Sequence, residues 1–336
     1  MIFTNGLGTS RQKKLQYFHE NTIFSTHRYR IFDHFDNLTF KKLYVYVKLF
    51  LISHNTNPTN LLTMTQYAST ITSQNRTAFV ILLDRSGSMA EPISFNGHRV
   101  SKAEALAEIT NRLIFELLCR ARRSDGVRNY FDVALIGYAG DALQPIVGNR
   151  KGFIPITEFE SMTQIKPARG GFALPQWVSP AAEGSTPMFE ALLEASDMVE
   201  EWCARPENAH SYPPTIFNIT DGEASDGDHA DIAEISDRLR SCSTTDGNAL
   251  LINIHLTSTA GERSVIFPRS INELEHNYYA RLLYECASEM PSNYSSAIAS
   301  LRGEAAGGRY RGMCFNASAA EVIAMINIGS ISLNVM

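Results

Sequence analysis

The sequence has few cysteines, no long apolar run and no recognisable export signal. Its five cysteines are widely spaced and include no CxxC pair, so neither a zinc site nor a disulfide framework is indicated. The longest apolar run, residues 43–52, is interrupted by Lys48 and is well short of the about 20 residues that a membrane span needs. Because the N-terminus also lacks the pattern of a signal peptide, we expect a cytoplasmic protein without a membrane span.

Common enzyme motifs are missing as well. The chain contains no GxGK[ST] phosphate loop, no GxSxG nucleophile elbow and no HExxH motif. His255 falls in an apolar segment and is interpreted as a core residue, whereas His98, His210 and His229 fall in loops or at helix starts. The net charge of −5 argues mildly against nucleic acid as a partner. We therefore expect no enzyme and assign no catalytic residue.

Residues 1–63 differ in composition from the rest of the chain. They carry eight Lys or Arg against three Asp or Glu, and they are rich in Phe and Tyr. Residues 44–50 have high β propensity but no obvious hairpin partner. We expect a domain over residues 64–336, preceded by a basic extension that is either weakly ordered or an artefact of an upstream start.

Strands alternate with helices over residues 77–328, which is typical of a parallel sheet with helices on both faces. The predicted class is therefore α/β, with a Rossmann-like, mostly parallel central sheet. Apolar runs predict strands at residues 79–83, 131–138, 215–220, 249–256 and 313–315, and an edge strand at residues 142–147.

Helix signals follow several of these strands. Ser101-Lys102-Ala103-Glu104 has the form of a capping box. Thr186 is a candidate N-cap, because the proline after it suits the first position of a helix. Apolar spacing predicts further helices around residues 232–239, 274–289 and 319–326. Residues 166–184 are rich in Gly and Pro and predict a surface loop, and the segment 257–312 is an elaboration with one expected helix.

Oxygen-bearing side chains follow the first strand. Asp84, Ser86 and Ser88 stand at positions i, i+2 and i+4 directly after the apolar run of residues 79–83. Open α/β sheets bind ligands at the carboxyl ends of their strands, and hard cations such as Mg²⁺ prefer oxygen ligands. This segment alone fits a polar turn as well as it fits a ligand loop.

Two later residues favour the ligand loop. Asp221 ends the strand at residues 215–220, just before Gly222, and Thr186 precedes a helix. If both strands are central and parallel, the three loops meet at one end of the sheet. Asp84 and Asp221 then lie close together, which is unfavourable unless a cation or a proton lies between them. The sequence therefore predicts a site for Mg²⁺ or Mn²⁺ at this end.

This set resembles the metal-ion-dependent adhesion site (MIDAS) of von Willebrand factor type A (vWA) domains. The matching residues are Asp84-x-Ser86-x-Ser88, Thr186 in a Ser-Thr-Pro-Met sequence, and Asp221 in Thr-Asp-Gly. The resemblance covers residues 77–328 and is nearest to soluble bacterial-type vWA proteins. It implies a metal bound by Ser86, Ser88 and Thr186, with Asp84 and Asp221 contributing directly or through water. It also implies that a carboxylate of a protein partner fills the open position.

Alternatives to such a docking module remain at this point. A metal-dependent hydrolase or phosphatase would need a general base, for which Glu223 and Asp226 are the available guesses. An adaptor subunit of an AAA+ chelatase-like or stress-response complex would need an ATPase on another chain. An EF-hand over residues 221–232 is rejected, because Asp226 replaces its glycine and Ile232 its glutamate. Glu223, Asp226 and Asp228 are interpreted as a solvated acidic rim.

Overall fold

The computed structural model describes residues 66–147, 152–167, 173–257, 263–274, 277–305 and 307–331. The predicted N-terminal extension and its boundary near residue 64 lie outside these residues. Within them, no helix combines the length and the hydrophobicity needed to cross a bilayer.

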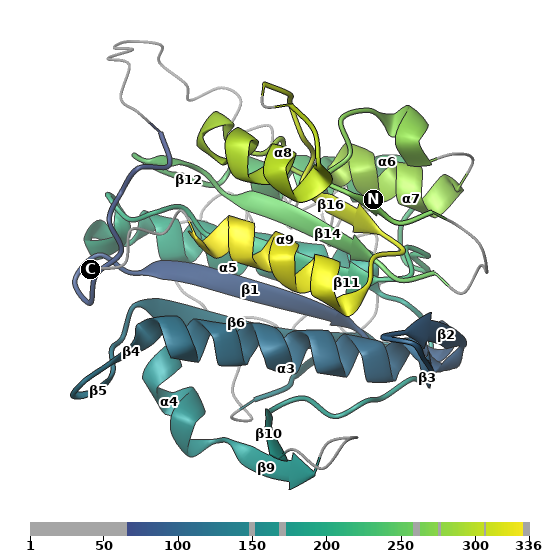
Figure 1. Ribbon diagram of the computed structural model, residues 1–336, viewed down its shortest axis with the longest axis horizontal. Helices are drawn as coiled ribbons and strands as arrows, with labels where there is room; N and C mark the ends of the chain where they lie inside the picture. Colours follow the sequence, from purple (N-terminus) through teal and green to yellow (C-terminus); the bar gives the residue numbers. More distant parts are fainter. Residues whose placement is uncertain are drawn as a thin grey trace, which may run out of the picture. The chain divides into compact units, whose positions relative to one another are not determined.

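One mostly parallel sheet forms the centre of the domain (Figure 1). Its order is β15-β16-β14-β11-β1-β6-β7, and the short strand β8 also pairs with β6. The strands are β1 (Thr77–Asp84), β6 (Phe131–Ala139), β7 (Ala142–Pro145), β8 (Ile154–Pro155), β11 (Thr215–Thr220), β14 (Leu250–His255), β15 (Val265–Ile266) and β16 (Met313–Phe315). Strands β6, β1, β11, β14 and β16 are parallel, and the antiparallel strand β7 lies at one edge as predicted. The structure adds β15 as an antiparallel strand at the opposite edge.

Helices cover both faces of this sheet, as the alternation of strands and helices predicts. Figure 1 shows α3 and α9 in front of the strands and α5 behind them. The helices are α3 (Lys102–Ala121), α4 (Ile156–Ser161), α5 (Met188–Ala204), α6 (His229–Ser241), α7 (Tyr278–Cys286), α8 (Ser295–Arg302) and α9 (Ala319–Ile331). The Rossmann-like fold class expected of a vWA domain is therefore confirmed.

Strand β1 is central, and its sequence is apolar from Ala78 to Leu83. All eight of its residues are buried, and it pairs in parallel with β6 on one side and β11 on the other. The predicted capping box begins α3: the Ser101 side chain accepts from the Glu104 backbone N–H, and the Glu104 carboxylate accepts from the Ser101 backbone N–H. The apolar run thus places β1, and the capping box starts α3. The loop that carries Ser86 and Ser88 lies between these two elements in the sequence.

Four short hairpins were not predicted. They pair β2 (Pro92–Phe95) with β3 (His98–Ser101), β4 (Arg122–Arg123) with β5 (Gly126–Val127), β9 (Gln164–Pro167) with β10 (Ala173–Gln176), and β12 (Ser243–Thr244) with β13 (Gly247–Asn248). The surface loop predicted for residues 166–184 is thus wrong in part, since β9 and β10 fall within or beside it. The described residues of the segment 257–312 include two α-helices, α7 and α8, where one was expected.

A buried chain of polar side chains crosses the middle of the sheet. The Tyr138 hydroxyl donates to Asn218 Oδ1 at 3.0 Å, and Asn218 Nδ2 donates to Asn253 Oδ1 at 3.1 Å. Asn253 Nδ2 then donates to the Leu283 carbonyl at 2.8 Å. These groups come from β6, β11, β14 and α7, so the hydrogen bonds link three strands and a helix below the predicted site.

Candidate metal centre

Asp84 is fully buried at the carboxyl end of β1. Its Oδ1 accepts from the Ser86 backbone N–H at 2.9 Å, and its Oδ2 accepts from the Thr220 hydroxyl at 2.7 Å. Burial raises the pKa of Asp84 to about 6, although hydrogen bonds from Ser86 and Thr220 oppose this rise; the nearby Asp221 carboxylate adds to it. The protein thus holds a carboxylate in a place that disfavours an uncompensated negative charge.

The two serines after Asp84 come together as their spacing predicts. Residues Gly87–Ala90 form a 3-10 turn (η1), with Ser86 at its N-cap. The turn places Ser86 Oγ 3.1 Å from Ser88 Oγ. Ser86 is buried and Ser88 is half-buried, so the pair offers two hydroxyl oxygens at the edge of the domain.

The loop that carries Thr186 is joined to the first loop through its backbone. The Gly87 N–H donates to the Gly184 carbonyl at 2.9 Å, two residues before Thr186. Gly184 has a φ of +73°, and an added Cβ would lie 2.8 Å from the backbone nitrogen of Gly140. Only glycine fits this close approach without a shift of the backbone.

Thr186 itself is not the helix cap that the sequence predicts. Helix α5 begins at Met188, and Pro187 occupies the N-cap position. The Thr186 N–H donates to Ser225 Oγ at 2.9 Å, and the Thr186 carbonyl accepts from the Ser225 N–H at 3.0 Å. Thr186 is therefore buried between the loops after β1 and β11, where its side chain is not needed for capping.

The acidic segment after Asp221 also caps helices, so its interpretation as a solvated rim is wrong for Asp226, whereas Glu223 and Asp228 are exposed as expected. The Asp226 carboxylate accepts from the backbone N–H groups of Phe189 and Glu190, both at 3.0 Å, at the start of α5. Asp228 is the N-cap of α6 and forms a capping box. Asp226 is thus engaged and unsuited to the role of general base, while Glu223 is exposed as expected.

Asp221 has an ion-pair partner that was not predicted from the sequence. Its Oδ2 lies 3.1 Å from Lys102 Nζ, and the Lys102 side chain is 5% exposed. Lys102 also contacts Glu91 Oε2 at 2.8 Å. A lysine in the first turn of a helix lies at the positive end of the helix dipole, and this unfavourable position was the signal available in the sequence.

His255 holds the backbone of Asp221 in place. Its Nε2 donates to the Asp221 carbonyl at 2.8 Å, and its ring stacks on Phe315. Burial lowers the pKa of His255 to about 4, so the imidazole is neutral near pH 7. This agrees with the interpretation of His255 as a core residue.

The donor atoms at this end of the sheet suit a small hard cation. Among the described residues, no cluster of three or more His, Cys, Asp or Glu side chains has the arrangement of a metal site. The candidate set depends instead on two carboxylates and on hydroxyl oxygens, which are Mg²⁺-type ligands. Asp221 Oδ1 is buried and has no hydrogen-bond partner, although buried carboxylate oxygens are normally paired. This unpaired oxygen is the observation that fits a cation.

Replacing Thr220 with valine is expected to weaken metal binding without removing a ligand. The change keeps the shape of a strand residue but leaves Asp84 Oδ2 without its hydroxyl donor. A hydrogen bond to a charged group contributes about 1.5–3 kcal/mol, so we expect a loss of about tenfold or more in Mn²⁺ affinity by calorimetric titration. Thr220→Ser keeps the hydroxyl and is the matched control; equal affinities for the two variants would contradict the role of this hydrogen bond.

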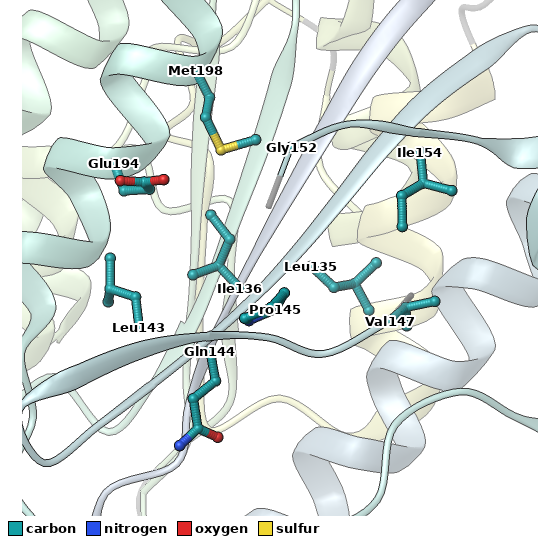
Figure 2. Close-up of a pocket in the computed structure, with 10 residues that line it drawn as sticks. All are labelled: Leu135, Ile136, Leu143, Gln144, Pro145, Val147, Gly152, Ile154, Glu194 and Met198. Atoms are coloured by element: carbon teal, nitrogen blue, oxygen red, sulfur yellow. The ribbon is translucent and has the colours of Figure 1, made fainter. Parts of the chain in front are cut away.

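A small, mostly apolar pocket lies elsewhere in the domain. Figure 2 shows residues of β6, β7 and α5 around it, among them Ile136, Leu143 and Met198. None of the residues at the candidate metal centre lines this pocket. We assign it no function.

Comparisons with known proteins complete the description of the site. No family model matches the chain, and no curated protein matches it. Solved structures do match: manganese-loaded TRAP protein of Plasmodium vivax has 15% identity and a TM-score of 0.39, covering 75% of this chain and 72% of that one. An aerotolerance-related membrane protein of Bacteroides fragilis has 18% identity and a TM-score of 0.31, covering 62% and 88%.

A third match is the vWF domain of the pilus tip protein Mfa5 of Porphyromonas gingivalis. It has 15% identity and a TM-score of 0.30, and the match covers 47% of this chain and 40% of that one. With TM-scores below 0.5, these matches support no statement about the function of this chain.

Proposed function

We propose that this protein is a protein-binding vWA module that docks an acidic residue of a partner onto a Mg²⁺ or Mn²⁺ ion. The observation that supports the proposal most directly is the unpaired, buried Oδ1 of Asp221 beside a buried Asp84. Two carboxylates in one buried place need a counter-charge, and a divalent cation supplies it together with an open coordination position.

Each residue has a distinct part in this proposal. Ser86, Ser88 and Thr186 would hold the ion through their hydroxyl oxygens, and Asp84 and Asp221 would neutralise it directly or through water. Thr220 and the Ser86 backbone orient Asp84, while His255 fixes the backbone of Asp221. The site lies mainly on loops that follow buried strands. The oxygen-bearing side chains proposed to hold the ion would therefore be in position before a partner binds.

Aromatic side chains beside Asp221 suit a docking surface. Tyr278 is 59% exposed and contacts His229 edge to face. Tyr279 lies next to Gly222, where an added Cβ would come within 2.7 Å of Tyr279 Cβ. Tyrosine is enriched at protein interfaces because it offers a large rigid contact area with a polar end.

The alternatives receive less support from the geometry. A hydrolase needs a general base beside the ion, and the Asp226 carboxylate already caps α5. An adaptor role in an AAA+ complex would use the same docking chemistry, with the ATPase as the partner. That role is thus a special case of the proposal.

Removal of the metal tests the proposal. The immobilised protein, incubated with extract of its own cells, is expected to retain specific partners in Mg²⁺ and to release them in EDTA, because the metal–carboxylate contact is lost. Recovery of the same partners under both conditions would contradict the proposal. Phosphatase turnover that requires Asp84 would favour the hydrolase instead.

A further inference from the structure

Lys102 places a fixed positive charge inside the candidate metal centre. Its side chain is 5% exposed, and lysine is almost never buried without a charged partner. Its backbone N–H donates to the Glu91 carbonyl at 2.9 Å, where the hairpin of β2 and β3 leads into α3. The position of the ammonium group is therefore set by the fold and does not depend on a mobile surface chain.

The Lys102 ammonium group contacts only one of the two carboxylate oxygens of the candidate ligand Asp221. Lys102 Nζ lies 3.1 Å from Asp221 Oδ2, whereas Asp221 Oδ1 is buried and has no hydrogen-bond partner in the part of the chain that the structure describes. The Asp221 side chain is 8% exposed, so solvent does little to neutralise it. The single positive charge of Lys102 thus compensates only one of the two buried carboxylates, since Asp84 has hydrogen bonds but no ion pair with any described residue.

A second carboxylate gives Lys102 an alternative partner. Glu91 Oε2 lies 2.8 Å from Lys102 Nζ, and the Glu91 side chain is 52% exposed. The Lys102 ammonium group can therefore stay paired with Glu91 when the Asp221 carboxylate binds a divalent cation. This arrangement avoids leaving a buried lysine without a partner, which is strongly destabilising.

We propose that Lys102 is a built-in counter-ion of the candidate metal centre. Its ammonium group neutralises Asp221 when no metal is bound and competes with the divalent cation for this carboxylate. Metal binding then requires an exchange in which Lys102 keeps Glu91 and releases Asp221. This inference rests on the proposed function of the site, and it adds that the affinity for metal is held down by the protein itself.

The test measures binding of Mn²⁺ alone, by calorimetry, to the full chain and to its Lys102→Met variant. Methionine keeps the length of the side chain and removes its charge, so the variant is expected to bind Mn²⁺ about tenfold more tightly or better. In EDTA its melting temperature should fall below that of the wild type, because Asp221 loses its partner; added Mn²⁺ should close the gap.

Arg85→Met is the matched control for charge. Arg85 follows Asp84 directly, and its Nη1 contacts Gln144 Oε1 at 3.4 Å rather than a ligand carboxylate. This variant removes one positive charge near the site without freeing Asp221, so we expect a smaller gain in affinity. Equal gains in the two variants would overturn direct competition.

The outcomes separate this inference from the proposed function. If the wild type binds Mn²⁺ and a folded Lys102→Met variant binds it no more tightly, the inference fails alone. If only the variant binds, Lys102 is the resident cation, and the metal-dependent docking of the native protein fails. If neither binds, both fail.

Discussion

Replacing Asp84 with alanine is expected to abolish metal binding and, with it, any metal-dependent capture of a partner. Asp84 supplies one of the two buried negative charges at the site. Two unit charges 4 Å apart interact by about 4 kcal/mol at an effective dielectric constant of 20, so its loss should lower the affinity for Mg²⁺ or Mn²⁺ at least about 100-fold. Calorimetric titration of the purified variant measures this directly.

The same variant requires a control for folding. Alanine leaves the Ser86 N–H and the Thr220 hydroxyl without their acceptor. Asp84→Asn keeps an oxygen for the Ser86 N–H, removes the charge and presents an amide N–H that the Thr220 hydroxyl can accept, so it should fold like the wild type and still fail to bind metal. Metal affinity close to that of the wild type in Asp84→Asn would contradict the assignment of Asp84.

Replacing Gly184 with alanine is expected to weaken metal binding although Gly184 offers no side-chain ligand. A residue with a side chain in this left-handed conformation costs about 1–2 kcal/mol. The added Cβ would also meet the backbone of Gly140 at 2.8 and 2.9 Å, so the loop must shift. Because the Gly184 carbonyl holds the Gly87 N–H, this shift separates Thr186 from the serine loop.

We expect a lower free energy of unfolding in urea and about a tenfold loss of Mn²⁺ affinity for this variant. Gly303→Ala is the matched control, since Gly303 has a φ of +68° and nothing within 4 Å of an added Cβ. Gly303 ends α8, so that variant should lose stability but keep its metal affinity. The role of the Gly184 loop would be disproved if both variants kept full affinity.

Much of the fold could be predicted because its central strands are buried on both faces. Such strands are mostly apolar, so β1 stands out in the sequence without any tertiary information, and β11 does so despite Asn218. The cap of α3 is equally local, since Ser101 and Glu104 are three residues apart. The hairpin of β2 and β3 has a signal too, because Asn96-Gly97 favours its turn, but each of its strands has only four residues.

The sequence offers the oxygen side chains of the candidate site but not the contacts that surround them. Asp84, Ser86 and Ser88 are close in sequence, and Thr186 and Asp221 each follow a recognisable pattern. The pairing of Lys102 with Asp221 could not be predicted, because it joins residues 119 positions apart and depends on where α3 lies. The capping of α5 by Asp226 could not be predicted for the same reason. Asp226 lies in the loop after β11, and its carboxylate accepts from backbone N–H groups at the start of a helix that is distant in the sequence.

The buried polar chain from Tyr138 through Asn218 to Asn253 has a consequence for where the strands end. A slip of one residue would turn Asn218 or Asn253 to the opposite face of the sheet and leave buried amides unpaired. Only one alignment of β6, β11 and β14 is therefore permitted. These hydrogen bonds thus act as a register lock: they hold β11 at one position between its neighbours, and with it Asp221, which follows the last residue of β11 directly.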